Sequence, residues 1–128
     1  MEEPIKPIKK ESRMSIKKVS KESIVPNKIE DGLWSGSNIA EIFPVSGDTK
    51  MSCGIHEIFA SDIVVEKSPV DDILYILEGE IEISADGVVN KYKAGDFAYL
   101  YAGSRQTFTI RNRVKHIYIT YPRDWSGE

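Results

Sequence analysis

Short runs of alternating apolar and polar residues, separated by turn-forming residues, make up most of this chain after Gly32. Residues 80–84 (Glu-Ile-Glu-Ile-Ser) alternate strictly, which predicts a strand with one face toward a core and the other toward water. Asp86-Gly87 follows and predicts a hairpin turn, because glycine accepts a positive φ at no steric cost. Further strands are predicted over residues 14–20, 51–60 with a bulge at Gly54, 63–65, 72–77, 88–93, 97–101, 107–111 and 114–121, with a tight turn at Asn112.

The same alternation predicts which side chains face the interior. Leu74 and Ile76 share the side of Asp72, because successive side chains of a strand point to opposite faces. Gly79 is expected to reset the alternation, so that Ile81 faces inward next. No segment has a convincing helical period, and many short strands with closely spaced turns are typical of an all-β sandwich or barrel.

The size and composition of the chain fit one soluble domain. It has 128 residues, of which 41% are hydrophobic and 29% charged, as in ordinary globular proteins. Residues 1–13 are rich in Lys and Glu and contain two prolines, so they are predicted to form a disordered basic tail. Residues 14–128 are predicted to form the folded domain.

The sequence gives no sign of membrane insertion or secretion. No apolar stretch approaches the ~18 residues needed to span a bilayer, and no apolar segment with a cleavage site stands at the N-terminus. A cytoplasmic location without a membrane partner is therefore expected. Cys53 is the only cysteine, so it cannot form an internal disulfide, and a buried reduced thiol is predicted.

Charge is distributed unevenly along the chain. The net charge is −3, yet residues 1–28 carry eight Lys/Arg and four Asp/Glu, so the remainder is strongly acidic. An acidic body argues against nucleic acid as the main partner. The basic segment is interpreted as a solvated tail, with contact to acidic surfaces or RNA as the alternative.

Two segments resemble the paired signature motifs of the cupin superfamily. The first is Asp72-Ile-Leu-Tyr-Ile-Leu-Glu-Gly-Glu80, in which Gly79 matches the last glycine of G-x5-H-x-H-x3,4-E-x6-G and Asp72 stands at the glutamate position. Glu66 and Ser68 stand where the two histidines of that motif would be. The resemblance implies a double-stranded β-helix, the jelly-roll barrel of RmlC-like cupins, as a single domain.

The second motif, G-x5-P-x-G-x2-H-x3-N, is matched by Gly95 and Gly103 with the correct spacing. Tyr101 replaces its proline, Gln106 its histidine and Ile110 its asparagine. The residues that bind a transition metal in many cupins are therefore missing from both motifs. The matching glycines imply the fold of the superfamily, whereas the positions of its metal ligands carry other residues.

A narrower resemblance is to the ethanolamine-utilisation protein Q (EutQ) family. It rests on Val70-Asp-Asp-Ile-Leu-Tyr-Ile-Leu-Glu-Gly79 and on Val114-Lys-His-Ile-Tyr-Ile-Thr-Tyr-Pro-Arg-Asp-Trp125. The resemblance implies a dimeric cupin linked to ethanolamine breakdown in bacterial microcompartments, with an acetate kinase activity. The chain departs from the family at Leu74, where a further acid is usual, and at Val64-Val-Glu66, where Phe-Pro-Trp is usual.

The interior of the predicted barrel is expected to hold a few polar groups on aliphatic walls, which describes a small-molecule site. Glu66, Asp72 and Gln106 are oxygen donors that suit a weakly held Mg²⁺ or other hard divalent cation rather than Zn²⁺ or Fe²⁺. No firmly bound cofactor is expected. The candidate catalytic residues are Asp72, Glu66 and His56, and the candidate ligand-binding residues are Gln106, Ser68, Asp71, Tyr101 and Arg105.

Both histidines and the last tryptophan have alternative interpretations. His56 is either an acid–base group with a pKa near neutrality or a packed strand residue. His116 is interpreted as structural. Asp71 and Asp72 are adjacent, so their carboxylates should lie on opposite faces of a strand. Trp125 is expected to cover an opening of the barrel or to pack on a neighbouring subunit.

Three functions remain open from the sequence. The first is an EutQ-like cupin of ethanolamine and acetate metabolism, the second a non-catalytic ligand-binding or assembly cupin, and the third an enzyme with an oxygen-ligand metal site. The phosphate-loop pattern Gly-x4-Gly-Lys-Ser/Thr is absent, although Gly103-Ser-Arg105 could approach an anion. The expected partners are a second copy of the chain, joined by sheet extension at the N-terminal strand, a small-molecule ligand and microcompartment proteins.

Overall fold

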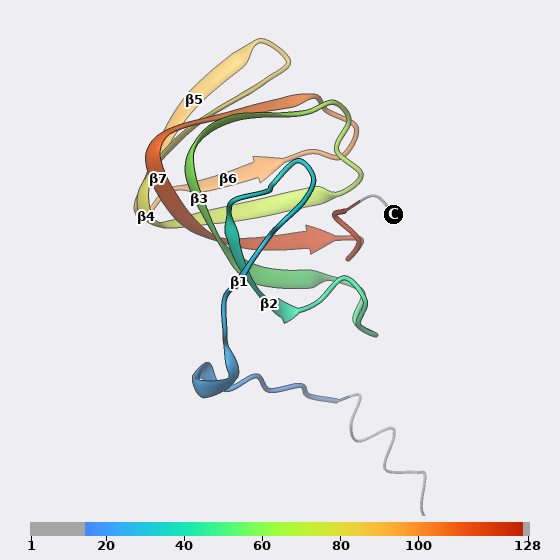
Figure 1. The fold of residues 1–128 in the computed structure, drawn as a ribbon. Coiled ribbons are helices and arrows are strands. Elements are labelled where there is room, and N and C mark those ends of the chain that lie inside the picture. Colours follow the sequence, from blue (N-terminus) through green and yellow to red (C-terminus); the bar gives the residue numbers. More distant parts are fainter. Residues whose placement is uncertain (1–14, 127–128) are drawn as a thin grey trace, which may run out of the picture.

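A single antiparallel sheet, curled around an internal space, forms the body of the protein (Figure 1). The computed structural model describes residues 15–126. The strand order in the sheet is β1-β2-β3-β7-β4-β5, and β6 pairs with β4. The all-β prediction is confirmed. The strands are β1 Asn27–Lys28, β2 Asn38–Phe43, β3 Ser52–Val65, β4 Asp71–Ala85, β5 Val88–Lys93, β6 Phe97–Leu100 and β7 Gln106–Tyr121.

The long strands β3, β4 and β7 each run through positions where the sequence suggests an interruption. The predicted turn at Asn112 is wrong, because β7 continues past it. Phe59 of β3 pairs with Arg113 and Ser61 pairs with Ile110, so Asn112 lies in a bulge where the strand bends. A bulge does occur beside Gly54, as predicted, but its extra residue lies on β2, between Glu41 and Phe43, which pair with Gly54 and Cys53. A further irregularity of β3 falls between Phe59 and Ser61.

Gly79 is the pivot of β4. Its φ is +80°, and a Cβ at this position would lie 2.0 Å from the carbonyl oxygen of Arg113 on β7. The pairing of β4 with β7 shifts register on either side of it, between Ile76 and Glu78 and again between Gly79 and Glu82. The predicted reset of the alternation is confirmed, since Ile76 and Ile81 are both buried although their separation is odd.

The hairpin between β4 and β5 is formed as predicted. Asp86 and Gly87 both have positive φ, 52° and 81°, which is the requirement of a two-residue type I′ turn. Ala85 pairs with Val88 directly across it. The turn therefore fixes the register of β5, whose residues are mostly exposed.

Aliphatic side chains from the inner faces form one core. Their burial supplies the main stabilising term, roughly 2 kcal/mol for each fully buried Ile, Leu or Val. Trp34, Val65 and Tyr92 pack against the edge of this cluster. The core consists of Ile58, Ile63, Leu74, Ile76, Ile81, Ile83, Ala98, Leu100, Phe108, Ile110 and Val114.

The segment before β1 lies away from the barrel (Figure 1). The strand predicted over residues 14–20 is not formed: residues 15–20 are not in a strand and their side chains are almost all exposed, and Met14 lies outside the described residues. A short 3-10 turn, Lys21–Ser23, follows. Lys17 is held by Asp48 of the β2–β3 loop at 2.9 Å. The tail predicted over residues 1–13 also lies outside the described residues.

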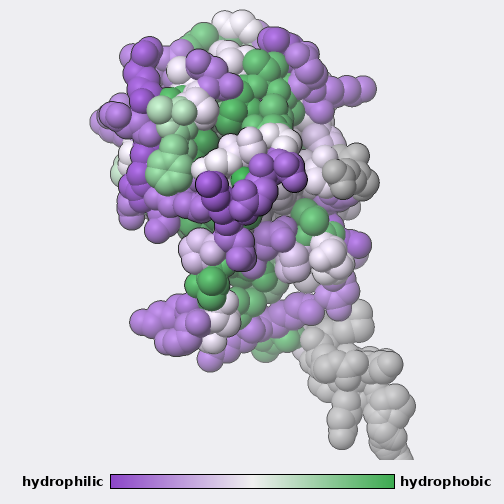
Figure 2. Space-filling view, in the orientation of Figure 1, coloured by the Kyte–Doolittle hydropathy of each residue, from purple (hydrophilic) through white to green (hydrophobic). Residues whose placement is uncertain are grey.

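The outer surface of the barrel is mainly polar, with some apolar area exposed among the polar side chains (Figure 2). Residues 15–126 contain no helix with the length and apolar character that crossing a membrane requires. Cys53 is free and half-buried rather than fully buried, and burial raises the pKa of its thiol.

Candidate functional site

The inward side chains of three neighbouring strands line up in rows across the barrel wall. β7 lies between β3 and β4, so each inward residue of β7 has one partner on each side. The register puts polar groups in the rows near the start of β3 and β4 and apolar groups beyond them. The rows are Ser52–Thr120–Asp72, Gly54–Tyr118–Leu74 and His56–His116–Ile76.

These rows form one wall of a cavity of about 550 Å³. That volume is typical of sites for small organic molecules. Apolar side chains line much of the rest of the cavity, among them Ile58, Ile81 and Phe108 on the strands and Trp34 on the segment between β1 and β2. The polar lining residues are Ser68, Asp72, Gln106, His56, His116, Tyr118, Thr120 and Ser126, and the exposed charged residues Asp31 and Lys67 also line the cavity.

Asp72 is the unusual group of this cavity. Its side chain borders the cavity, its Oδ1 is enclosed, and this atom receives no hydrogen bond from residues 15–126. Burial raises the pKa of the carboxyl from 3.8 to about 8. A buried polar atom without a partner is rare and costs free energy, so an unmet acceptor facing a cavity suggests a ligand.

His56 lies on β3 and is held by a hydroxyl from the β1–β2 segment. The Ser37 hydroxyl donates to the Trp34 carbonyl at 2.6 Å, so its single hydrogen is used and it must accept from His56 Nε2 at 2.8 Å. Nδ1 of His56 is thereby left with its lone pair. Burial, with a smaller contribution from His116, lowers the pKa of His56 to about 3, so the expected pKa near neutrality is wrong.

His116 is the opposite tautomer. Its Nδ1 lies 3.3 Å from the carbonyl oxygen of Ile117, which only accepts, so Nδ1 carries the hydrogen and Nε2 the lone pair. Burial lowers its pKa to about 4. The two imidazole centroids are 5.6 Å apart. Sequence reasoning treated His116 as structural, although its shared alternation with Val114 and Tyr118 indicates the inner face.

Gln106, at the start of β7, is held like His56 by a serine relay, in which a side-chain N–H donates to a serine hydroxyl that itself donates to a backbone carbonyl. The Ser104 hydroxyl donates to the Tyr101 carbonyl at 2.7 Å, and Gln106 Nε2 donates to the Ser104 hydroxyl at 2.9 Å. The amide nitrogen is therefore turned outward to the loop, which leaves Oε1 as the free end of a side chain that is only 3% exposed. Ser68 uses its hydroxyl on the Val70 carbonyl at 2.8 Å.

Tyr118, from the middle row of the cavity wall, meets Trp125 of the C-terminal segment, with ring centroids 6.0 Å apart in an edge-to-face arrangement. The Tyr118 ring lies over Gly54, where a Cβ would come within 2.4 Å of the phenol oxygen. Among the described residues, neither the Tyr118 hydroxyl nor the Trp125 indole nitrogen has a hydrogen-bond partner. Sequence reasoning expected Trp125 at a barrel opening but gave Tyr118 no role.

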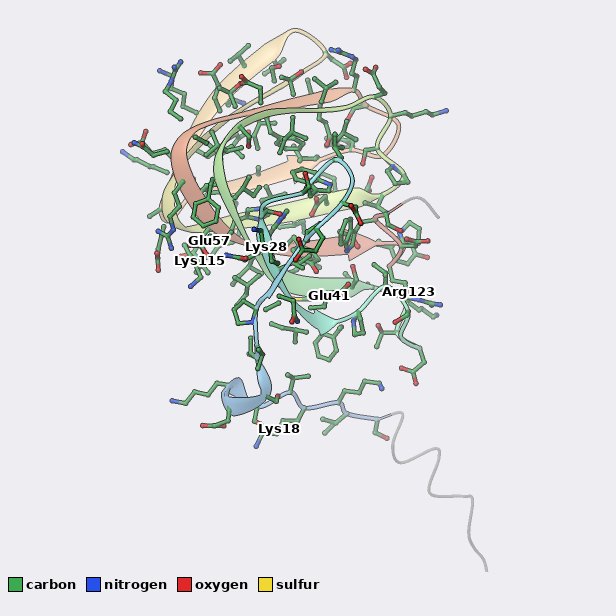
Figure 3. The ribbon with its side chains drawn as sticks, in the orientation of Figure 1. Lys18, Lys28, Glu41, Glu57, Lys115 and Arg123 are labelled. Atoms are coloured by element: carbon green, nitrogen blue, oxygen red, sulfur yellow. The ribbon has the colours of Figure 1, made fainter. Side chains whose placement is uncertain are left out.

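The C-terminal segment that carries Trp125 is fastened to the β2–β3 loop. Arg123, labelled in Figure 3, donates to the carbonyl oxygens of Val45 at 2.8 Å and Thr49 at 3.1 Å. Thr120 turns its hydroxyl toward the Pro122 carbonyl at 3.2 Å. These bonds hold the segment where Trp125 can close one side of the cavity.

Several predicted site residues lie outside the cavity. Glu66 follows the end of β3 and forms an exposed ion pair with Arg105 at 3.0 Å. Asp71 accepts hydrogen bonds from the Tyr99 hydroxyl and, at 2.7 Å, from the backbone nitrogen of Ala102. Tyr101 is exposed on the outer side beside Tyr99.

The structure therefore does not bring together the three oxygen donors predicted to hold a cation. Asp72 and Gln106 border the cavity, whereas the Glu66 carboxylate is turned to Arg105 because the chain leaves the sheet after Val65. Within residues 15–126 there is no group of three or more His, Cys, Asp or Glu side chains arranged to hold a metal ion.

The curled antiparallel sheet with a cavity in its interior defines a cupin-type barrel, and solved structures agree. The chain is similar to an RmlC-like cupin from Shewanella frigidimarina NCIMB 400, with a TM-score of 0.68 and 15% identity over 84% of this chain and 92% of that one. It is also similar to a putative ethanolamine utilization protein Q from Salmonella typhimurium LT2, with a TM-score of 0.71 and 19% identity over 85% and 88% of the two chains.

Residues 2–127 match the family described as ethanolamine utilisation protein EutQ, and the chain belongs to this family. A curated relative named acetate kinase EutQ from Clostridioides difficile strain 630 is 25% identical over 69% of this chain and 55% of its own length. The acetate kinase EutQ of Escherichia coli K12 is 34% identical over 44% of this chain and 24% of its own length. The chain thus spans about half or less of these relatives.

Proposed function

We propose that this chain serves ethanolamine utilisation by binding a small organic molecule in its barrel cavity. The observation that supports this most directly is the enclosed Oδ1 of Asp72, which lacks a donor in a cavity of about 550 Å³. A barrel that had only to fold would be more stable with an apolar side chain at this position. The stability lost by burying an unpaired carboxyl is expected if that carboxyl serves to bind a ligand.

A thermal-shift screen of the purified chain tests the proposal. The compounds are short amines, alcohols, aldehydes, carboxylates and their phosphates, each alone and with Mg²⁺. A compound present at a hundredfold its dissociation constant adds about 2.7 kcal/mol of stability, a readily visible rise in Tm. The rise in Tm caused by such a compound should change in Asp72→Asn, because Asp72 belongs to the proposed binding site. A screen in which no compound changes the Tm contradicts the proposal.

Acetate kinase activity is the second candidate, supported by the names of the two curated relatives. The reaction moves the γ-phosphoryl group of ATP to acetate and yields ADP and acetyl phosphate. Such transfer relies on cations around the phosphates, and Lys67 is the only Lys or Arg among the described residues of the cavity lining. Acetate-dependent release of ADP by the wild-type chain, abolished in Lys67→Met but kept in Lys91→Met, would support this candidate. No acetate-dependent ADP release would remove it.

The homodimer, the microcompartment partners and the cytoplasmic location remain predictions. Light scattering of the purified chain measures the first of them directly. A mass of one chain at micromolar concentration would overturn it.

A further inference from the structure

The polar groups of the cavity share one property: most of them can only accept a hydrogen bond from a ligand. His56 and Gln106 each give their hydrogens to a serine hydroxyl, which is itself committed to a backbone carbonyl. His116 gives its hydrogen to the Ile117 carbonyl. What these three side chains offer the cavity is a ring nitrogen lone pair or an amide oxygen.

The charge of the lining has the same bias. Among the described residues inside the cavity, Asp72 has the only carboxyl group, while Lys67 and Asp31 are exposed at the margin and have opposite charges. Neither histidine supplies a positive charge, because burial lowers the pKa of both well below neutrality. A carboxylate or phosphate ligand would therefore meet lone pairs and a carboxyl group without a buried cation to pair with.

Aromatic rings complete the setting. Trp34 lies edge-on to His56, with centroids 5.2 Å apart, and its ring is 5.5 Å from that of Phe108. Both rings line the cavity. The faces of such rings attract cations and repel anions, which adds to the preference of the lone pairs.

We propose that the ligand of this cavity is a protonated primary amine, whose ammonium group pairs with the carboxylate of Asp72. The inference rests on the proposed binding function and names the chemical class that the site accepts. An ammonium group has three donors and no acceptor, so it matches an enclosed carboxylate oxygen that lacks a donor. The hydroxyl of Tyr118 and the indole N–H of Trp125 are left to donate to an oxygen elsewhere in the ligand.

The test compares amines with alcohols in which a hydroxyl replaces the ammonium group. The pairs are ethanolamine with ethylene glycol, 5-amino-1-pentanol with 1,5-pentanediol, and phenethylamine with 2-phenylethanol. Acetate and glycolate serve as anions. Affinity is measured by isothermal titration calorimetry on the full chain at pH 8.5, because burial raises the pKa of the Asp72 carboxyl to about 8 and the carboxyl must be ionised to pair with an ammonium group. At least one amine should bind roughly tenfold or more tightly than its paired alcohol, because only the amine forms a charged hydrogen bond with Asp72.

Two variants assign the preference to one carboxyl. Asp72→Asn keeps the shape and removes the charge, so the amine should lose about tenfold or more in affinity, while its paired alcohol changes by no more than about threefold. Asp62→Asn removes an exposed carboxylate of β3 and should leave both affinities unchanged. Thermal unfolding of each variant checks that it is folded.

The outcomes separate the two proposals. If alcohols or carboxylates bind as tightly as the amines, or if Asp72→Asn leaves amine affinity intact, the amine inference is wrong while ligand binding in the cavity stands. If none of the amines, alcohols or acids binds, the amine inference and the proposed binding function both fail. At least one amine preferred over its paired alcohol, with the preference lost only in Asp72→Asn, is the expected result.

Discussion

Asp71 and Asp72 are neighbours on β4 that occupy opposite sides of the barrel wall. Outside, the carboxylate of Asp71 is satisfied by a tyrosine hydroxyl and a backbone N–H, and these bonds lower its pKa. Inside, the carboxyl of Asp72 has an enclosed oxygen without a partner, and burial raises its pKa to about 8. The carboxylate on the outer face thus forms structural hydrogen bonds, whereas the carboxyl on the inner face keeps one oxygen available for a ligand.

The difference is a consequence of strand geometry and cannot be read from residue type. Successive side chains of a strand point to opposite faces, so a step of one residue moves a side chain from the interior to the exterior. The bulge at Gly79 therefore decides which side chains of β4 beyond it are enclosed. The comparison also predicts opposite responses to pH and to substitution at adjacent positions.

The largest loss of stability is expected at the bulge itself. Gly79→Ala places a Cβ 2.0 Å from the Arg113 carbonyl oxygen at a φ of +80°, so β4 and β7 must separate or the alternation must change. We expect a loss of about 4 kcal/mol or more in the free energy of unfolding, measured by urea denaturation. Gly87→Ala is the matched control, because its φ of +81° has no atom within 4 Å of the added Cβ, and it should cost only about 1 kcal/mol. Equal losses would mean that the close approach to β7 does not matter.

Asp72→Asn should stabilise the protein in a pH-dependent way. The folded-state pKa is raised from 3.8 to about 8, so the native state holds the proton more tightly than the unfolded state. The contribution of Asp72 to the stability of the wild type is therefore highest below about pH 4, falls as the pH rises toward 8 and is level above it. The variant should match the wild type near pH 4 and exceed it by about 5 kcal/mol at pH 8, because a change of one in pKa corresponds to about 1.4 kcal/mol. A constant difference across this range would show that Asp72 does not titrate as described.

Ser37→Ala breaks the relay behind His56. The imidazole N–H then loses its acceptor, which should cost about 1–2 kcal/mol and free the ring to exchange tautomers. Long-range ¹H–¹⁵N correlation spectra report the tautomer: in the wild type, His56 should carry its hydrogen on Nε2 and His116 on Nδ1. Neither ring should titrate above pH 5, given pKa values of about 3 and 4. A titration near pH 6.5 for either ring would overturn this arrangement.

Asp71→Asn should give the smallest change, with a sign opposite to that of Asp72→Asn. Hydrogen bonds from Tyr99 and Ala102 lower the folded-state pKa, so the stability they supply is present above the ordinary pKa of an aspartate and is lost as the pH falls through the lowered value. The variant should be slightly less stable than the wild type at pH 7 and equal to it in strong acid. Greater stability at pH 7 would contradict the assignment of the two faces.

Much of this contrast could be predicted from the local sequence. Alternation placed Asp71 and Asp72 on opposite faces, and the Glu78-Gly79 pair marked where the alternation changes. These features depend on a few adjacent residues, and the alternation of a strand can be recognised over such a short stretch of sequence.

The relays and the second histidine could not be found in this way. The pairing of His56 with His116 depends on the register of β3 and β7, and that register is shifted by a bulge whose position near Asn112 the sequence suggested as a turn. Ser37 reaches His56 from a segment nineteen residues earlier. Such contacts follow from strand pairing, and no local pattern encodes them.

Gly54 gives the cavity a simple means of adjustment. Because the Tyr118 ring rests directly on this residue, the shape of the space inside depends on the absence of one carbon atom in the neighbouring strand. A methyl group at position 54 would displace the phenol, and it would also lie 2.7 Å from the carbonyl oxygen of Ala40 on β2. For protein engineering, position 54 is therefore a size control that acts through the Tyr118 phenol and leaves the carboxyl of Asp72 in place.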